Sequence, residues 1–502
     1  MSKLGWATGS DRGHFHHGLL ANKACVLSLL FTFCLHGCSA PSGSEPALSR
    51  QVDELFAEWD RPESPGAVVG VFRDGRTVYA QGYGAANLDH GVKLTPQSVL
   101  RIGSISKQFV AMGIALLAEE QRLSLDDDIR AHLPEMPSYG ETITIRHLLH
   151  HTSGIREYLA LVGLVGQPEG GVYGYTSDDL LALLSRQAAL NFAPGERFSY
   201  SNSGYFLLAQ IIGRVSGMKA SAFAKQRIFD PLGMSDTRLY DDRTAIVPNL
   251  AYGYSRGDDG NYQLDILRSD VIGDLGVVTT IGDFFRWNEN FYDNKLGAGG
   301  PGLIEMVQRR GRTADGKELS YASGLEWDSY RGLTTVGHSG SAVGYVADFV
   351  QFPEERFAVV VLSNFSELRP GRLARRIADL YLADRFTEDL PGERTSRPDS
   401  EEPPRATLSV RQLEQFAGHF YSEELDFVYS LEVREGELEL TVRGREIPLV
   451  AESKGRFNGP RMVLEFERLG SGAISSLLVH AGEVRNIRFE PVEARRPRAI
   501  RP

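Results

Sequence analysis

Strand-like segments stand at both ends of a long helix-rich stretch, and this arrangement constrains the fold more than any other feature. Residues 66–82 hold two runs rich in β-branched and aromatic residues, joined by Asp74-Gly75, a strong hairpin signal. A second hairpin is predicted over residues 345–364, with its turn at residues 353–356. The sequence therefore predicts an α+β fold, in which one antiparallel sheet joins both ends and an all-helical subdomain is inserted between them.

Helices are predicted beside this sheet. Residues 51–59 form a short amphipathic pattern, and residues 372–382 give a closing helix. Residues 104–122 carry apolar side chains at helical spacing, namely Phe109, Met112, Leu116 and Leu117. Ser104 would lie at or near the start of that helix.

The composition changes after residue 387. Residues 388–405 are rich in proline and charge and can bury little apolar surface, so they are predicted to be a linker. Residues 416–491 then alternate polar and apolar residues with frequent turn signals, which predicts a small all-β domain, either a barrel or a sandwich. A chain of 502 residues is long enough for such a division.

The overall charge argues against nucleic-acid binding. The formal net charge is −11, and no basic patch is evident in the sequence to offset it. A small-molecule or peptide substrate is the partner that we expect, and no cofactor is predicted. The sequence does not indicate the oligomeric state.

All three cysteines, Cys25, Cys34 and Cys38, lie near the start of the sequence. An apolar run over residues 24–35 follows Lys23; it is too short to span a bilayer but is typical of a signal-peptide core. A small residue precedes Cys38 and a Ser/Pro/Gly-rich segment follows it, which resembles a bacterial lipoprotein cleavage site. We therefore expect export to the periplasm or cell envelope with a lipid anchor at Cys38; an ordinary signal peptide cut near Ala40 is the alternative.

Three short motifs in a fixed order point to chemistry. Ser104 and Lys107 are three residues apart, so on a helix they share one face and the amine can activate the hydroxyl. Tyr200-Ser-Asn202 and then His338-Ser-Gly340 follow, and Tyr200 and His338 can complete a proton relay if the fold brings them in. This is the arrangement of a serine acyl-transfer enzyme.

Each motif alone is weak. Ser216 with Lys219 repeats the first spacing and Tyr292 with Asn294 repeats the second, but Ser216 is predicted to end a helix. Ser104 could instead merely cap a helix, and Tyr200 could be a packed aromatic residue. The His147, His150 and His151 group suggests a metal site, but it lacks a nearby carboxylate in register, and no metal is predicted.

Together the motifs resemble those of the serine β-lactamase and penicillin-binding-protein family, in its class C-like branch of esterases, D-aminopeptidases and D-Ala-D-Ala carboxypeptidases. Residues 148–154, 229–235 and 275–280 also resemble this branch. The resemblance covers roughly residues 50–385 and implies the sheet-plus-helices fold already predicted. The C-terminal domain resembles, more loosely, the lipocalin-like β domains often fused to such enzymes.

The resemblance implies a role for each matching residue. Ser104 would be the acylated nucleophile, Lys107 and Tyr200 the general base, and Asn202 a substrate ligand. Substrate binding would also involve Ser339, Gly340 and Ser341, with the backbone N–H groups of Ser104 and Ser341 forming the oxyanion hole. His338 stands where β-lactamases of this branch carry lysine, which favours the peptidase and esterase members.

These expectations give one hypothesis and two alternatives. The hypothesis is a serine hydrolase that acts through an acyl-enzyme on an amide or ester, such as a D-residue peptide or a small ester. The alternatives are a penicillin-binding receptor on the same fold and an inactive binding module whose β domain acts through a partner. The predicted domains are a signal peptide (1–38), a tether (39–50), the hydrolase domain (51–387), the linker (388–405), the β domain (406–496) and a tail (497–502).

Overall fold

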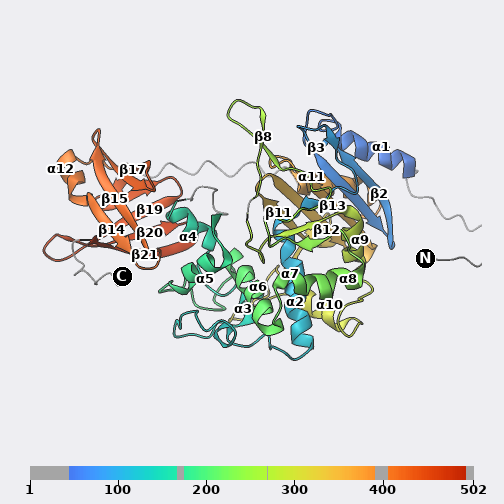
Figure 1. Ribbon diagram of the computed structural model, residues 1–502, viewed down its shortest axis with the longest axis horizontal. Coiled ribbons are helices and arrows are strands. Elements are labelled where there is room, and N and C mark those ends of the chain that lie inside the picture. Colours follow the sequence, from blue (N-terminus) through green and yellow to red (C-terminus); the bar gives the residue numbers. More distant parts are fainter. Residues whose placement is uncertain (1–44, 167–173, 268, 390–404, 493–502) are drawn as a thin grey trace, which may run out of the picture. The chain divides into compact units, whose positions relative to one another are not determined.

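A six-stranded antiparallel sheet lies at the centre of the hydrolase part of the chain. The computed structural model describes residues 45–166, 174–267, 269–389 and 405–492. The strand order is β10-β11-β12-β13-β1-β2 (Figure 1). The strands are β1 (Ala67–Arg73), β2 (Arg76–Tyr83), β10 (Glu326–Tyr330), β11 (Leu333–Ala342), β12 (Tyr345–Phe352) and β13 (Phe357–Ser363).

The prediction that the sheet joins both ends of this region is confirmed. In the middle of the sheet β1 pairs with β13, with Ala67 opposite Ser363 and Arg73 opposite Phe357. Both predicted hairpins form, since β1 also pairs with β2, and β12 also pairs with β13. Every residue of β13 is buried, so the strand is covered on both faces.

Helices cover both faces of the sheet, and alternate residues of β1 show this. Ala67, Val69 and Val71 belong to a core with α1 (Glu45–Phe56) and α11 (Pro370–Tyr381). Val68 and Phe72 point to the other face and belong to a core with α2 (Lys107–Glu119) and α9 (Ile281–Asn290). Successive side chains of a strand point to opposite faces of the sheet, so alternate residues of β1 belong to different cores.

The first helix departs from its prediction. It begins already at Glu45, so residues 45–50 of the predicted tether are helical. The reason is packing, because Leu48 lies against the apolar core formed with α11 and the sheet. The predicted signal peptide and Cys38 lie outside the described residues.

The inserted region is mostly helical, as predicted. Its helices are α3 (Ile145–Leu149), α4 (Tyr158–Leu164), α5 (Ser177–Ser185), α6 (Asn202–Ser216), α7 (Ala220–Ala224), α8 (Asp230–Leu232) and α10 (Gly302–Gln308), in addition to α2 and α9. Short strands accompany them: β3 (Ala85–Asn87) with β4 (Val92–Lys93), β5 (Leu100–Arg101) and β6 (Arg238–Leu239) with β9 (Val277–Thr279), and β7 (Tyr254–Arg256) with β8 (Tyr262–Leu264).

The C-terminal domain is a closed antiparallel barrel, which decides between the two predicted architectures. Its strands are β14 (Gly418–Ser422), β15 (Phe427–Arg434), β16 (Glu437–Val442), β17 (Arg445–Ser453), β18 (Arg456–Gly459), β19 (Met462–Arg468), β20 (Ile474–Ala481) and β21 (Val484–Pro491), preceded by the short α12 (Val410–Leu413). Pairing of Phe420 with Pro491 closes the barrel. Closure removes the exposed edges that a sandwich would leave.

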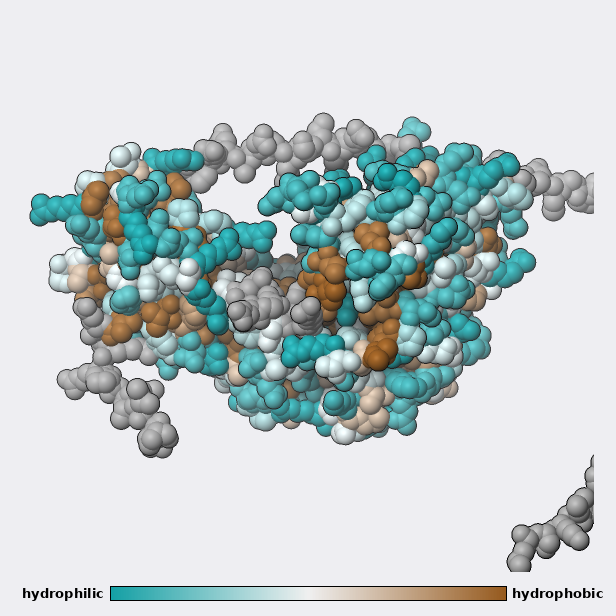
Figure 2. All heavy atoms as spheres, turned by 45° about the horizontal axis from the view of Figure 1, so that its top comes forward, coloured by the Kyte–Doolittle hydropathy of each residue, from teal (hydrophilic) through white to brown (hydrophobic). Residues whose placement is uncertain are grey.

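The described residues contain no helix that is both long and apolar enough to cross a membrane. The face of the molecule in Figure 2 is coloured mostly as hydrophilic, with apolar residues in small groups. Small exposed apolar groups of this kind are normal on protein surfaces.

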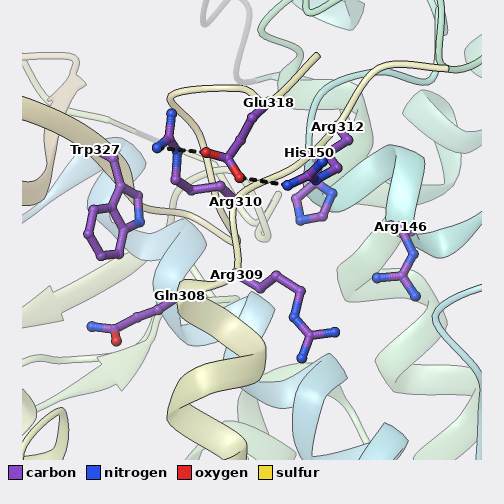
Figure 3. A pocket seen from close by; sticks show the side chains of 8 residues that line it. All are labelled: Arg146, His150, Gln308, Arg309, Arg310, Arg312, Glu318 and Trp327. Carbon is purple, nitrogen blue, oxygen red and sulfur yellow. Dashed lines mark hydrogen bonds and ion pairs between the residues drawn. The ribbon is translucent and has the colours of Figure 1, made fainter. Parts of the chain in front are cut away.

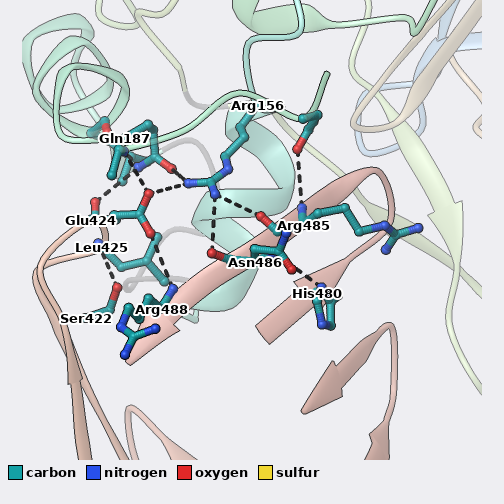
Figure 4. A network of polar contacts seen from close by, with 12 residues as sticks. Arg156, Gln187, Ser422, Glu424, Leu425, His480, Arg485, Asn486 and Arg488 are labelled. Atoms are coloured by element: carbon teal, nitrogen blue, oxygen red, sulfur yellow. Dashed lines mark hydrogen bonds and ion pairs between the residues drawn. The ribbon is translucent and has the colours of Figure 1, made fainter. Parts of the chain in front are cut away.

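A buried arginine links the helical region to the barrel. The side chain of Arg156 is 1 % exposed, and its guanidinium group forms an ion pair with Glu424, in the turn between β14 and β15. It also donates to the side chain of Gln187, at 3.0 Å, and to the carbonyl oxygen of Arg485, at 2.8 Å. Figure 4 shows these groups converging on Arg156. A buried guanidinium needs such a set of acceptors because its desolvation is costly.

We expect Glu424→Ala to lower the free energy of unfolding by about 3 to 5 kcal/mol, because it leaves the buried charge of Arg156 unpaired. Urea denaturation of the full chain, followed by circular dichroism, measures this. Glu423→Ala removes an exposed neighbouring carboxylate and is the matched control, for which we expect a change within about 0.5 kcal/mol. Equal stability of the two variants would contradict this account of the network.

Candidate active site

Ser104 lies on a tight helical turn, Gly103–Ser106, that runs directly into α2. Gly103 has a φ of +52°, and a Cβ atom there would lie 2.5 Å from the backbone nitrogen of Ser341. Only glycine allows both this backbone conformation and this close approach. The turn therefore holds the Ser104 region against β11.

The amine of Lys107 is fully buried in the first turn of α2. Its Nζ atom lies 3.0 Å from Ser104 Oγ, 2.8 Å from Asn202 Oδ1 and 2.9 Å from the carbonyl oxygen of Asp274. The last two atoms can only accept hydrogen bonds. A neutral amine has two hydrogens, so it can give one to each of them and keep its lone pair for the hydroxyl of Ser104.

Burial makes the neutral form of this amine accessible. Desolvation lowers the pKa of Lys107 to about 8, although the carboxylates of Asp274 and Glu157 act in the opposite direction. Asp274 is itself buried, which raises the pKa of its carboxyl group, and it accepts a hydrogen bond from the hydroxyl of Tyr158 at 2.9 Å. Lys107 is thus poised near neutral pH, where a general base is most effective.

The amide of Asn202 is held in one orientation. Its side-chain nitrogen donates to Glu157 Oε1 at 3.2 Å, and its backbone nitrogen donates to Glu157 Oε2 at 2.6 Å. Because Asn202 Nδ2 is directed to the carboxylate, Oδ1 faces Lys107. Glu157 therefore acts on the site through Asn202.

Tyr200 lies beside these groups, just before α6. Its hydroxyl is buried, makes no hydrogen bond of good geometry with the described residues, and lies near the hydroxyl of Ser104. Burial raises the pKa of Tyr200, and the hydroxyl of Ser104 partly offsets the rise. The ring is fixed by the ring of His151, with centroids 4.3 Å apart, and Lys107 Nζ lies 4.8 Å from its centre. The phenol is protonated at neutral pH and available to a substrate.

His338 is buried and neutral. Burial, and then the charge of Lys107, lower the pKa of His338 to about 4. Its Nδ1 atom lies 2.5 Å from the carbonyl oxygen of Ser339, to which it donates, so Nε2 accepts from the hydroxyl of Tyr321 at 3.0 Å. Both ring nitrogens of His338 are engaged in hydrogen bonds, so the uncharged ring orients the residues that it contacts.

The end of β11 is open toward the site. The pairing of β10 with β11 stops at Glu326 opposite Gly337, so no strand of the described part of the chain pairs with residues 338–342 on that side. A Cβ atom at Gly340 would lie 3.2 Å from the backbone nitrogen of Ser104, which shows how closely this strand end approaches the serine. A pocket of about 460 Å³ covers the region and is lined by Ser104, Tyr200, Glu326, His338, Ser339, Gly340, Ser341, Val346, Ala347, Asp348, Pro370 and Gly371.

The structure thus brings the predicted site residues together and separates the chance matches. Ser216 is the last residue of α6, and Tyr292 follows the end of α9. Within the ranges that the structure describes, no group of three or more His, Cys, Asp and Glu side chains is arranged to hold a metal ion. Among the described histidines, His150 is buried and burial lowers its pKa to about 4.

Four further groups shape the site but were not predicted: Glu157, Asp274, His151 and Tyr321. Glu157 and Asp274 lie in segments that resemble the family or border on them, yet nothing in their local sequence marks them as partners of Lys107. Their roles arise from contacts between residues far apart in the chain.

Comparison with known proteins agrees with this geometry. Residues 52–383 match the family model described as Beta-lactamase. The chain is 30% identical over 334 residues to a penicillin-binding protein of Bacillus subtilis, covering 63% of this chain and 72% of that protein. It is 29% identical over 302 residues to a D-aminopeptidase of Gluconobacter oxydans, covering 60% of this chain but only 56% of the aminopeptidase.

A solved structure resembles nearly the whole chain. It is the octameric penicillin-binding protein homologue from Pyrococcus abyssi, with a TM-score of 0.58 and 25% sequence identity. The alignment covers 88% of this chain and 98% of that one. Since the family match extends over well more than half of its residues, the chain belongs to the Beta-lactamase family.

Proposed function

We propose that the chain is a serine hydrolase that cleaves an amide or ester through an acyl-enzyme on Ser104. The observation that carries the proposal is the contact of Ser104 Oγ with the buried amine of Lys107, at 3.0 Å. A serine hydroxyl becomes a useful nucleophile only beside a base, and this amine is held as a base by burial.

In acylation, neutral Lys107 accepts the proton of Ser104 while Oγ attacks the carbonyl carbon of the substrate. The carbonyl oxygen becomes negatively charged, and the backbone N–H groups of Ser104 and Ser341 would receive it. When the bond to the leaving group breaks, Tyr200 gives its proton to the leaving nitrogen or oxygen. The ammonium of Lys107, which faces the Tyr200 ring, then returns a proton to the phenol.

Deacylation repeats these steps with water. Lys107, neutral again, takes a proton from the water as its oxygen attacks the acyl carbon. The bond between the acyl carbon and Ser104 Oγ breaks, and the ammonium of Lys107 returns its proton to Oγ, which restores the neutral amine and releases the acid product. No metal or cofactor takes part in this scheme.

We propose an acyl donor with a free amino group, such as a D-aminoacyl amide or a short peptide with an N-terminal D-residue. The pocket contains the carboxylates of Glu326 and Asp348, while His338 places no positive charge where it could attract a substrate carboxylate. The similarity to a D-aminopeptidase supports the same class of substrate.

Ser104→Ala should lower kcat/KM for a D-aminoacyl amide by at least about a thousandfold, because the nucleophile is lost. Ser216→Ala is the matched control, since Ser216 repeats the spacing to a lysine outside the site, and it should retain full activity. Intact-protein mass after treatment with a fluorophosphonate should show an adduct that only Ser104→Ala lacks.

The same mass measurement with a penicillin tests the alternative of a penicillin-binding receptor. A lasting adduct on Ser104 with no turnover of any amide or ester would favour the receptor and overturn the hydrolase. If neither the fluorophosphonate nor the penicillin modified Ser104, the result would favour the inactive binding module whose barrel domain acts through a partner.

The activity should rise with pH through a midpoint near 8, because Lys107 must lose its proton before it can act as the base. Asp274→Asn removes a negative charge that raises the pKa of Lys107, so the midpoint should move to lower pH. The measurement is kcat/KM between pH 5 and 10. Asp293→Asn changes an exposed carboxylate and should leave the midpoint unchanged; a shift in that variant or a rise in the midpoint of Asp274→Asn would contradict the assignment.

A further inference from the structure

A second pocket, separate from the one at Ser104, is walled by arginines. It has a volume of about 460 Å³ and is lined by Arg146, His150, Gln308, Arg309, Arg310, Arg312, Glu318 and Trp327 (Figure 3). These side chains come from α3, from the end of α10 with the turn that follows it, and from β10. The fold brings the basic run of Arg309, Arg310 and Arg312 beside Arg146, which lies far away in the sequence.

The charges in this pocket do not balance. Glu318 is shared between Arg310, at 2.8 Å, and Arg312, at 3.1 Å. Arg146 has its own partner outside the lining, Asp126, at 2.8 Å. Four guanidinium groups thus face two carboxylates, and the surplus is two positive charges in a chain whose net charge is −11.

Two hydrogen-bond donors in the lining are unused. The side chain of Arg309 is exposed and makes no ion pair or hydrogen bond with any of the described residues, and it lines the same pocket as Arg146 (Figure 3). The indole nitrogen of Trp327 is buried without a hydrogen-bond partner in the described ranges. His150 adds no charge, because burial lowers its pKa to about 4.

We propose that this pocket binds a small organic oxyanion with at least two negative charges, carried on phosphate or carboxylate groups. Guanidinium groups bind such planar or tetrahedral oxyanions through paired N–H donors. Two charges match the surplus, and the free donors of Arg309 and Trp327 can meet the oxygens. The volume leaves room beyond a single oxyanion group for a carbon skeleton packed against the indole ring.

Backbone hydrogen bonds connect the segment that lines this pocket to the proposed catalytic groups. The backbone nitrogen of Gly311 donates to the carbonyl oxygen of Tyr321 at 2.8 Å, and Tyr321 donates to His338. The backbone nitrogen of Ala314 donates to the carbonyl oxygen of Gly195, at 2.7 Å, in the turn that precedes Tyr200. An oxyanion that holds Arg309, Arg310 and Arg312 would therefore stiffen a segment that also supports the site at Ser104.

Isothermal titration calorimetry on the full chain tests the proposal, with pyrophosphate and citrate as probes and acetate as the singly charged comparison. We expect one molecule of a doubly or more highly charged probe to bind per chain, and acetate to bind at least tenfold more weakly. Stronger binding of pyrophosphate would identify phosphate as the preferred group, and stronger binding of citrate would identify carboxylate.

Arg309→Gln should weaken this binding at least tenfold, because the residue supplies the unpaired charge and makes no contact that the fold needs. Arg411→Gln, which changes an exposed arginine of α12, is the matched control and should bind as the unaltered chain does. Thermal unfolding and hydrolysis without added anion should be the same in all three proteins. Absence of heat with every probe, or equal binding by Arg309→Gln, would overturn the proposal whether or not the chain is a hydrolase.

Discussion

The buried amine of Lys107 is the constraint on which the rest of the site depends. A charged ammonium in this position is costly, and a neutral one still needs acceptors for its hydrogens. The fold supplies the partners of the amine from three separate regions: the acceptors are Asn202, which begins α6, and Asp274, which precedes β9, while the hydroxyl of Ser104 comes from the turn before α2. The hydrogen-bond partners that the buried Lys107 amine requires are thus the same groups that the proposed mechanism uses.

Much of this arrangement could be predicted from the sequence, because it depends on local patterns. The alternation of β1 and β13 and the Asp74-Gly75 turn predicted the sheet, and the spacing of Ser104 to Lys107 predicted their contact. Glu157, Asp274 and Tyr321 could not be found in this way. Asp274 meets Lys107 across 167 positions of the sequence, and such a contact leaves no periodic signal. The arginine pocket was missed for a different reason: Arg309, Arg310 and Arg312 stand together in the sequence, but a short basic run does not show that the fold places it beside Arg146 and Trp327.

The barrel and the site are connected through adjacent residues. Arg156 bonds to groups of the barrel, and the next residue, Glu157, orients Asn202 beside Lys107. Ser203 holds this segment, because its hydroxyl donates to the carbonyl oxygen of Arg156 at 2.8 Å and accepts from the backbone nitrogen of Tyr158 at 2.7 Å. A change in the barrel at Glu424 would thus act on Arg156, which is joined by one peptide bond to the residue that orients Asn202.

The pairing of β1 with β13 also affects how the chain is made. Val68 and Leu362 are partners in the sheet but are separated by nearly the whole hydrolase region. At a synthesis rate of about 5 to 20 residues per second, β1 leaves the ribosome roughly 15 to 60 s before its partner exists. During that interval an apolar strand with unpaired edges must be kept from aggregating. The central pairing of the sheet can therefore form only after β13 has been synthesised, so the sheet is completed late.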